Sequence, residues 1–152
     1  MRRSRLILAA AAGLLAALLP AAAIHAAGSD AAPAGAVSIP SAAEVPVDQG
    51  VRLLMVERDG CIYCRKWRHD VLPGYALTGE GRAAPLATVP LDGPWPDGLA
   101  LARRPFVTPT FVLLRDGREL ARIEGYVGED AFWPRLRDML AGNGIALPGT
   151  GG

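Results

Sequence analysis

The sequence has few residues of the kinds that bind metal ions or build several disulfides. Its 152 residues include two cysteines and two histidines, too few to fill a four-ligand structural zinc site. Two cysteines also exclude the framework of many bridges that holds some small secreted domains together. The chemistry of soft ligands is therefore confined to one closely spaced pair, Cys61 and Cys64.

Charge of one sign is also lacking. Charged residues make up 20% of the chain, and the formal net charge is +1. This balance gives no electrostatic footprint for nucleic acid, so no nucleic-acid partner is expected. Hydrophobic residues, at 51%, exclude a disordered polyampholyte. The length fits one domain with a targeting segment attached.

Residues 1–26 have the pattern of a secretory signal peptide. Three arginines precede an uncharged run, rich in Ala and Leu, that ends in small residues, the order that export signals show. We expect cleavage after Ala26, with cleavage after Ala23 as the alternative. An uncleaved anchor is the competing interpretation, because the uncharged run of residues 6–27 could span a bilayer. Export would place the protein in an oxidising compartment such as the bacterial periplasm.

Composition divides the rest of the chain into three parts. Residues 27–40 are mostly Ala, Gly, Pro and Ser and are expected to be a flexible lead-in. Residues 41–147 have the hydrophobic pattern of a single domain, long enough to bury a core without bridges. Residues 148–152 are expected to be a disordered tail.

The hydrophobic pattern predicts both strands and helices. The expected strands cover residues 51–57, 87–91, 107–114 and 119–124, and the expected helices cover residues 61–72 and 129–140. Pro73-Gly74 is expected to end the first helix, with a loop-rich middle after it. Asp116-Gly117 marks a hairpin turn. This order predicts an α/β domain with a mixed sheet.

A Cys-x-x-Cys motif lies where the first strand passes into the first helix. Cys61 is expected at the helix N-terminus, where unpaired backbone N–H groups and the helix dipole favour a thiolate. Cys64 follows one turn later, close enough to form a disulfide with Cys61. The pair is therefore predicted to be a redox centre: Cys61 attacks a partner disulfide, and Cys64 resolves the mixed disulfide.

Two other interpretations of the pair remain open. A purely structural bridge would close a loop of four residues and add about 2 kcal/mol on the chain-entropy model. Two thiolates also suit Cu(I), so a copper carrier is the non-enzymatic alternative, although no methionine or histidine lies beside the pair in the sequence.

Thr108-Pro109 is the second part of the predicted site. A proline at the start of an apolar strand costs a ladder hydrogen bond, so it calls for a reason. A cis Thr108–Pro109 bond would place the turn against the cysteines and leave backbone groups free for an extended substrate. The alternative is a trans proline on an edge strand. With the cysteine motif upstream, the cis form is favoured.

Taken together, these motifs resemble the thioredoxin superfamily, and the Tyr63-Cys64 ending is similar to the glutaredoxin active site. More narrowly, the chain resembles the periplasmic SoxS-type thioredoxins of bacterial sulfur oxidation. The stretches that carry this narrower resemblance are residues 60–67, 80–86, 108–111 and 124–126. The resemblance covers about residues 50–140 and implies a central mixed sheet flanked by helices, in one domain after the signal peptide.

The resemblance also implies a function. Such a protein reduces a disulfide or adduct on the cysteine of a sulfur-carrier protein, with electrons from a membrane thiol transporter and no bound cofactor. Cys61 would attack and Cys64 would resolve, while Ile62-Tyr63 and Thr108-Pro109 would line the substrate groove. A general periplasmic oxidase is a second enzymatic alternative, although the site lacks a histidine between its cysteines.

The chain departs from ordinary thioredoxins at several positions. Ile62-Tyr63 replaces the usual Gly-Pro, and Met55 stands where thioredoxins place a buried aspartate in the strand. The group that takes the proton of the resolving thiol is therefore open. Glu57 and Asp59 are nearby candidates, and solvated loop charges are their more ordinary interpretation.

Overall fold

The computed structural model describes residues 38–149, which contain four strands and four helices. In chain order, the elements are β1 (Val51–Glu57), α1 (Ile62–Asp70), α2 (Leu72–Tyr75), α3 (Gly79–Ala83), β2 (Leu86–Pro90), β3 (Thr110–Arg115), β4 (Arg118–Glu124) and α4 (Glu129–Gly142). The predicted α/β class is confirmed. Within residues 38–149, no helix is both long and apolar enough to cross a membrane.

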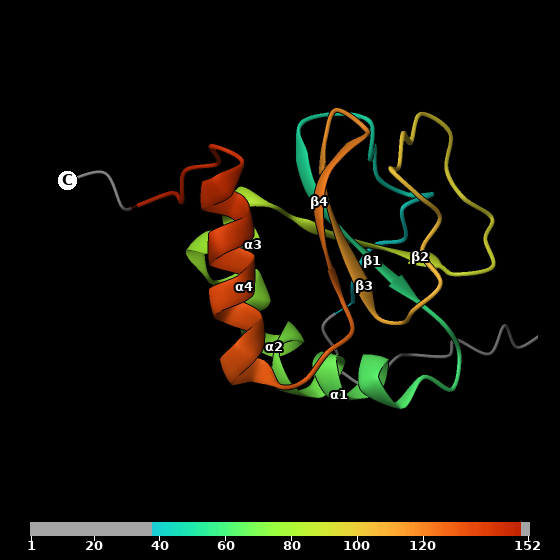
Figure 1. Ribbon diagram of the computed structural model, residues 1–152, viewed down its shortest axis with the longest axis horizontal. Helices are drawn as coiled ribbons and strands as arrows, with labels where there is room; N and C mark the ends of the chain where they lie inside the picture. Colours follow the sequence, from blue (N-terminus) through green and yellow to red (C-terminus); the bar gives the residue numbers. More distant parts are fainter. Residues whose placement is uncertain (1–37, 150–152) are drawn as a thin grey trace, which may run out of the picture. The chain divides into compact units, whose positions relative to one another are not determined.

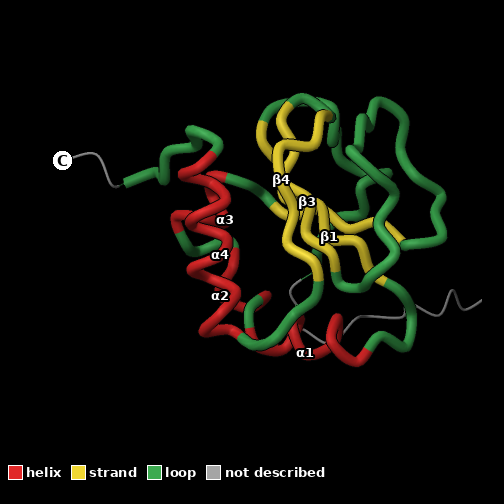
Figure 2. Tube along the Cα trace, in the orientation of Figure 1, coloured by secondary structure: helices red, strands yellow, loops and turns green. Residues whose placement is uncertain are grey.

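The strands form one mixed sheet in the order β2-β1-β3-β4, and Figure 2 shows the strands in yellow. β1 and β2 are parallel, and the three helices α1–α3 lie between them in the chain, as a parallel pair requires a long crossover. β3 pairs antiparallel with both β1 and β4. Asp116 and Gly117 have φ values of 50° and 75°, which suits the tight turn predicted for the β3–β4 hairpin.

Both faces of the sheet are buried, each against its own core. Successive residues of a strand point to opposite faces. Leu53 and Met55 face a core shared with the helices, whereas Leu54 and Val56 face a second core. The helix-side core holds the buried aromatic residues Trp67, Tyr75, Phe111, Tyr126 and Phe132. Among the described residues, the second core draws on no helix and is covered by loop residues within 42–47 and 91–101. Figure 1 shows α2–α4 on one side of the sheet and the β2–β3 connection on the other.

Several predicted boundaries are wrong. The helix predicted to end at Pro73-Gly74 ends at Asp70, and Pro73 instead lies in the first turn of α2, where a missing N–H costs nothing. The loop-rich middle contains α3, whose N-terminus is capped by Thr78 Oγ1, which accepts from Gly81 N–H at 3.0 Å. The strand predicted from Val107 begins at Thr110, because the proline before it cannot donate to the ladder.

Most of the N-terminal predictions lie outside the described residues. The signal peptide at 1–26, nearly all of the lead-in at 27–40 and the last residues of the tail at 148–152 stay predictions. From Ile39 onward the chain packs on the domain: the Pro40 carbonyl accepts from Thr88 N–H at 3.0 Å, and Ala42 N–H donates to the Thr88 carbonyl at 2.7 Å. This pairing adds residues 40–42 to the edge of β2.

Candidate active site

Three loops meet at one end of the sheet, where β1 and β4 end and β3 begins. β1 and β4 run antiparallel to β3, so the ends of β1 and β4 lie beside the start of β3 (Figure 1). The register confirms this, because Thr110 pairs with Val56 on one side and with Glu124 on the other. The residues that follow β1, precede β3 and follow β4 are thereby brought together from distant parts of the sequence.

The two cysteines lie at this end of the sheet and form a disulfide, with 5.3 Å between their Cα atoms. Cys61 is the N-cap of α1, and its Sγ accepts a hydrogen bond from Cys64 N–H at 3.1 Å. Cys61 is partly exposed, whereas Cys64 is 3% exposed. In the dithiol form, the same N–H and the helix dipole would stabilise a thiolate on Cys61. The outer sulfur is therefore the accessible one.

A tight turn delivers Cys61 to its position. Cys61 N–H donates to the Arg58 carbonyl at 3.1 Å, and Gly60 between them has φ of +74°, a conformation that side chains with a Cβ rarely adopt. The turn lets the chain leave β1 and enter α1 within a few residues. The predicted placement of the motif between a strand and a helix is confirmed.

Thr108 and Pro109 lie against the disulfide. The Thr108–Pro109 bond is cis, as favoured from the sequence, and the Thr108 carbonyl oxygen is 3.5 Å from Cys61 Sγ. The Pro109 carbonyl accepts from Gly125 N–H at 2.8 Å, which joins this turn to the loop after β4. Thr108 N–H has no hydrogen-bond partner within the described part of the chain, so it is free to pair with a polypeptide.

Exposed apolar side chains lie on the segments that carry the disulfide and its neighbours. We call Ile62, Tyr63, Phe106 and Val127 the apolar rim, and they are 64%, 56%, 71% and 81% exposed. They come from the three segments that meet at this end of the sheet. They are four of the five large apolar side chains that are exposed in the described residues. Sequence analysis identified Ile62 and Tyr63 but missed Phe106 and Val127, whose exposure depends on where β3 begins and β4 ends.

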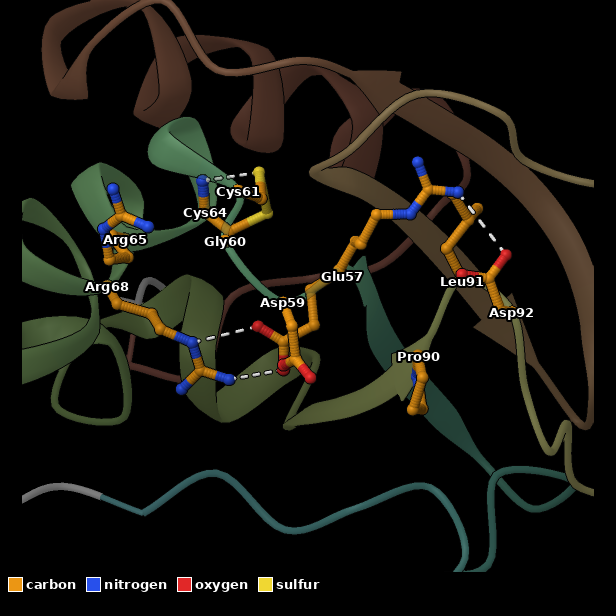
Figure 3. A pocket seen from close by; sticks show the side chains of 11 residues that line it. Glu57, Asp59, Gly60, Cys61, Cys64, Arg65, Arg68, Pro90, Leu91 and Asp92 are labelled. Atoms are coloured by element: carbon orange, nitrogen blue, oxygen red, sulfur yellow. Dashed lines mark hydrogen bonds and ion pairs between the residues drawn. A yellow bond between two sulfur atoms is a disulfide. The ribbon is translucent and has the colours of Figure 1, made fainter.

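A pocket of about 510 Å³ opens beside the cysteines (Figure 3). Its lining includes both cysteines, three arginines and the three carboxylates Glu57, Asp59 and Asp92. Arg68 Nε donates to Glu57 Oε2 at 3.0 Å, and Arg68 Nη2 donates to the other oxygen. The interpretation of Glu57 as a solvated loop charge is therefore wrong, because it ends β1 and is paired, whereas Asp59 is exposed. Cys64 lines this pocket although it is only 3% exposed.

The described residues show no cluster of three or more His, Cys, Asp and Glu side chains able to hold a metal ion. This end of the sheet carries a cysteine pair, a free backbone N–H donor and exposed apolar side chains. This arrangement suits an exchange of disulfide bonds with a second polypeptide.

A family profile described as a thioredoxin-like domain matches residues 41–140. The chain belongs to the thioredoxin-like family. With its cysteine pair at disulfide distance, it is a thiol–disulfide oxidoreductase of that family. The predicted fold, a mixed sheet with flanking helices, is confirmed as well.

This thioredoxin-like chain is similar to several solved structures. The periplasmic thioredoxin SoxS from Paracoccus pantotrophus, in its reduced form, is 49% identical over 60% of this chain and 96% of its own, with a TM-score of 0.59. A thioredoxin from Thermus thermophilus is 23% identical over 70% of this chain and 88% of its own, with a TM-score of 0.48. A search of curated proteins found no match.

A hydrogen bond ties the loop after β4 to the end of α1 in this thioredoxin-like domain. The Tyr126 hydroxyl donates to Asp70 Oδ2 at 2.9 Å, and Lys66 Nζ donates to the same oxygen at 2.8 Å. Hydrogen bonds from Lys66, His69 and Tyr126 hold the pKa of Asp70 far below its usual value. Burial, together with the bond to Asp70, raises the pKa of Tyr126. The contact holds the loop after β4 against the helix that carries the cysteines at its other end.

Replacing Asp70 with asparagine should lower the melting temperature in a pH-dependent way. Because the folded-state pKa is depressed, the stabilisation by Asp70 is complete above the unfolded pKa of about 4 and is lost as the pH falls below it. Thermal melts should show a difference between wild type and Asp70→Asn that is constant above about pH 5 and shrinks toward about pH 2. Asp138→Asn, at an exposed position of α4, is the control. A difference that stays constant over the acid range would contradict this role.

Proposed function

We propose that the protein is a periplasmic reductase that acts on a disulfide or thiol adduct of a sulfur-carrier protein. The observation that carries the proposal is the partly exposed Cys61 sulfur at the α1 N-terminus, 3.5 Å from the Thr108 carbonyl. The similarity to the SoxS structure, described as a periplasmic thioredoxin, supports the compartment and the thiol chemistry; the sulfur carrier is the partner that the sequence resemblance implies. The signal-peptide pattern of residues 1–26 agrees with export.

In the proposed reaction, the Cys61 thiolate attacks one sulfur of the partner's disulfide. A bond forms between Cys61 and that sulfur, and the other sulfur leaves as a thiolate that takes up a proton. Cys64 then loses its proton to solvent in the pocket and attacks Cys61 Sγ, which releases the partner's second thiolate. The partner has gained two electrons, and Cys61–Cys64 is again a disulfide. A membrane thiol donor would return it to the dithiol.

The groove beside the cysteines is proposed to hold the partner as an extended segment. The free N–H of Thr108 would pair with its backbone, Pro109 would fix the turn, and Ile62 and Tyr63 would contact its side chains. Main-chain pairing supplies affinity without dependence on sequence, so the exposed side chains must supply selectivity.

The rate of reduction of two protein disulfides tests this proposal. The dithiol protein is mixed with a single-cysteine sulfur carrier whose thiol is blocked as a mixed disulfide, and separately with insulin. We expect kcat/KM for the carrier to exceed that for insulin by about tenfold or more, a difference of about 1.4 kcal/mol in binding of the transition state. Equal values would indicate a general reductase. Tight stoichiometric Cu(I) binding without reduction of either protein would indicate a copper carrier.

A further inference from the structure

The segment that joins β2 to β3 carries Phe106 and Thr108 to the site. Between residues 91 and 109 it has no helix and no strand beyond a single bridge at Ala100. That bridge holds the segment to β4: Ala100 N–H donates to the Gly117 carbonyl at 2.9 Å, and Glu119 N–H donates to the Ala100 carbonyl at 3.0 Å. The backbone is thus fixed several residues before Phe106.

Side chains of β4 extend this attachment toward the site. Arg122 donates through Nε and Nη2 to the two carboxylate oxygens of Glu119, each at 2.6 Å, and through Nη2 to the Arg103 carbonyl at 2.8 Å. Glu119 Oε2 also accepts from Ala102 N–H at 2.9 Å. The side chains of Arg122 and Glu119 are 10% and 6% exposed. An ion pair this buried is costly unless its geometry is good and other hydrogen bonds satisfy it. Here both Glu119 oxygens and two Arg122 nitrogens are hydrogen-bonded, and Arg122 Nη1 lies 3.5 Å from Glu124 Oε1 without a hydrogen bond.

Arg103, whose carbonyl is held by Arg122, in turn contacts the Phe106 ring. Its Nη2 is 2.9 Å from Glu124 Oε1, and its guanidinium carbon lies 5.4 Å from the centre of the Phe106 ring, within the range of a cation–π contact. An aromatic ring that is 71% exposed is thereby held at a defined place in solvent. Phe106 lies two residues before Thr108, so about 7 Å of chain separates their Cα atoms.

We infer that Phe106 is a contact for the protein substrate, taking an apolar side chain near the substrate's reactive cysteine, and that Arg122 is the residue that positions it. A mixed disulfide at Cys61 places the substrate polypeptide over Thr108, because the Thr108 carbonyl is 3.5 Å from Cys61 Sγ. Phe106 lies on the same segment as Thr108, two residues earlier, with its side chain exposed. An aromatic anchor that is already fixed, and that loses its water when the substrate covers it, contributes more to binding than a flexible contact of equal area. The inference deepens the proposed function but needs only that the substrate be a protein.

Steady-state reduction of insulin and of a small aromatic disulfide by the full chain tests the inference. Phe106→Ala should raise KM for insulin about tenfold while kcat and the reaction with the small disulfide stay within about twofold. Leu77→Ala is the matched control, because Leu77 is 78% exposed on the segment between α2 and α3, and its KM should equal that of wild type.

Arg122 should act through the loop without touching the substrate. Arg122→Gln should raise KM for insulin as Phe106→Ala does, Arg122→Lys should restore part of the loss, and the double variant should be no worse than either single one. Arg104→Gln, which removes an exposed guanidinium that contacts Trp95 instead, should leave KM unchanged. Thermal melts identify any Arg122 variant that fails to fold, and Phe106→Ala then decides alone.

An unchanged insulin KM in Phe106→Ala would overturn the inference. So would an equal loss with the small disulfide, because that substrate has no polypeptide to bind. Insulin reduction requires only thiol–disulfide exchange, so these outcomes do not depend on whether a sulfur carrier is the physiological partner. Failure of the carrier to react faster than insulin would refute the proposed function and leave the Phe106 result intact.

Discussion

Cys64→Ser should turn the enzyme into a trap for its substrate. Under the proposed mechanism, Cys61 still attacks the partner disulfide, but no second thiol remains to release the product. A mixed disulfide through Cys61 should therefore accumulate in the presence of a protein disulfide. Cys61→Ser should accumulate little adduct, because Cys64 is 3% exposed, and disulfide reduction should fall on the order of 10³-fold or more in either variant.

Non-reducing gels followed by mass spectrometry of the adduct measure this effect. The peptide that contains the mixed disulfide should contain Cys61, and its other half should identify the partner. The variant with both cysteines replaced by serine gives the background. Adducts formed equally by Cys64→Ser and Cys61→Ser would show that the two sulfurs are equally reachable, which contradicts the proposed roles.

Trp67→Ala should cause the largest loss of stability among the aromatic substitutions considered. Trp67 is fully buried, and its ring lies 5.1 Å from the Phe111 ring and 5.6 Å from the Phe132 ring, centre to centre. It joins α1 to β3 and α4, so its removal leaves a cavity that three elements must close. The free energy of unfolding should fall by about 3–5 kcal/mol.

Denaturant unfolding of Trp133→Ala provides the comparison. The Trp133 ring stacks on Tyr75 with centres 6.0 Å apart, but Trp133 is only partly buried, at the margin of the helix-side core. Its loss should reduce the free energy of unfolding by less than half of the Trp67 effect, because solvent already reaches one side of the ring. Equal losses would show that Trp67 is not the centre of the core.

The sheet was predictable where the signal is local. The apolar run of β1, buried on both faces, matches residues 51–57 as predicted, and Asp116-Gly117 marks the hairpin by its backbone preference alone. The helices α2 and α3 were not found. Each is shorter than two turns, which is too few residues for hydrophobic periodicity to indicate a helix. Pro73 lies in the first turn of α2, whereas the sequence indicated the end of a helix there.

The candidate site divides in the same way. Cys61, Cys64 and Pro109 were predicted because the chemistry of each can be inferred from neighbouring residues. Phe106 and the pairing of Glu57 with Arg68 depend on tertiary arrangement. Phe106 directly precedes the strand predicted from Val107, and its exposure follows from β3 beginning at Thr110. No local pattern separates an aromatic residue of a site from one of a core.

The pH dependence of Cys61 alkylation in the dithiol protein tests the central claim most directly. The rate of reaction with iodoacetamide reports the thiolate, and each modified cysteine is identified by mass spectrometry. An N–H donor at 3.1 Å from Cys61 Sγ and the α1 N-terminus predict a Cys61 pKa below that of a free cysteine, with Cys64 unmodified. Faster modification of Cys64, or a Cys61 pKa at or above the free value, would contradict a thiolate nucleophile at this position.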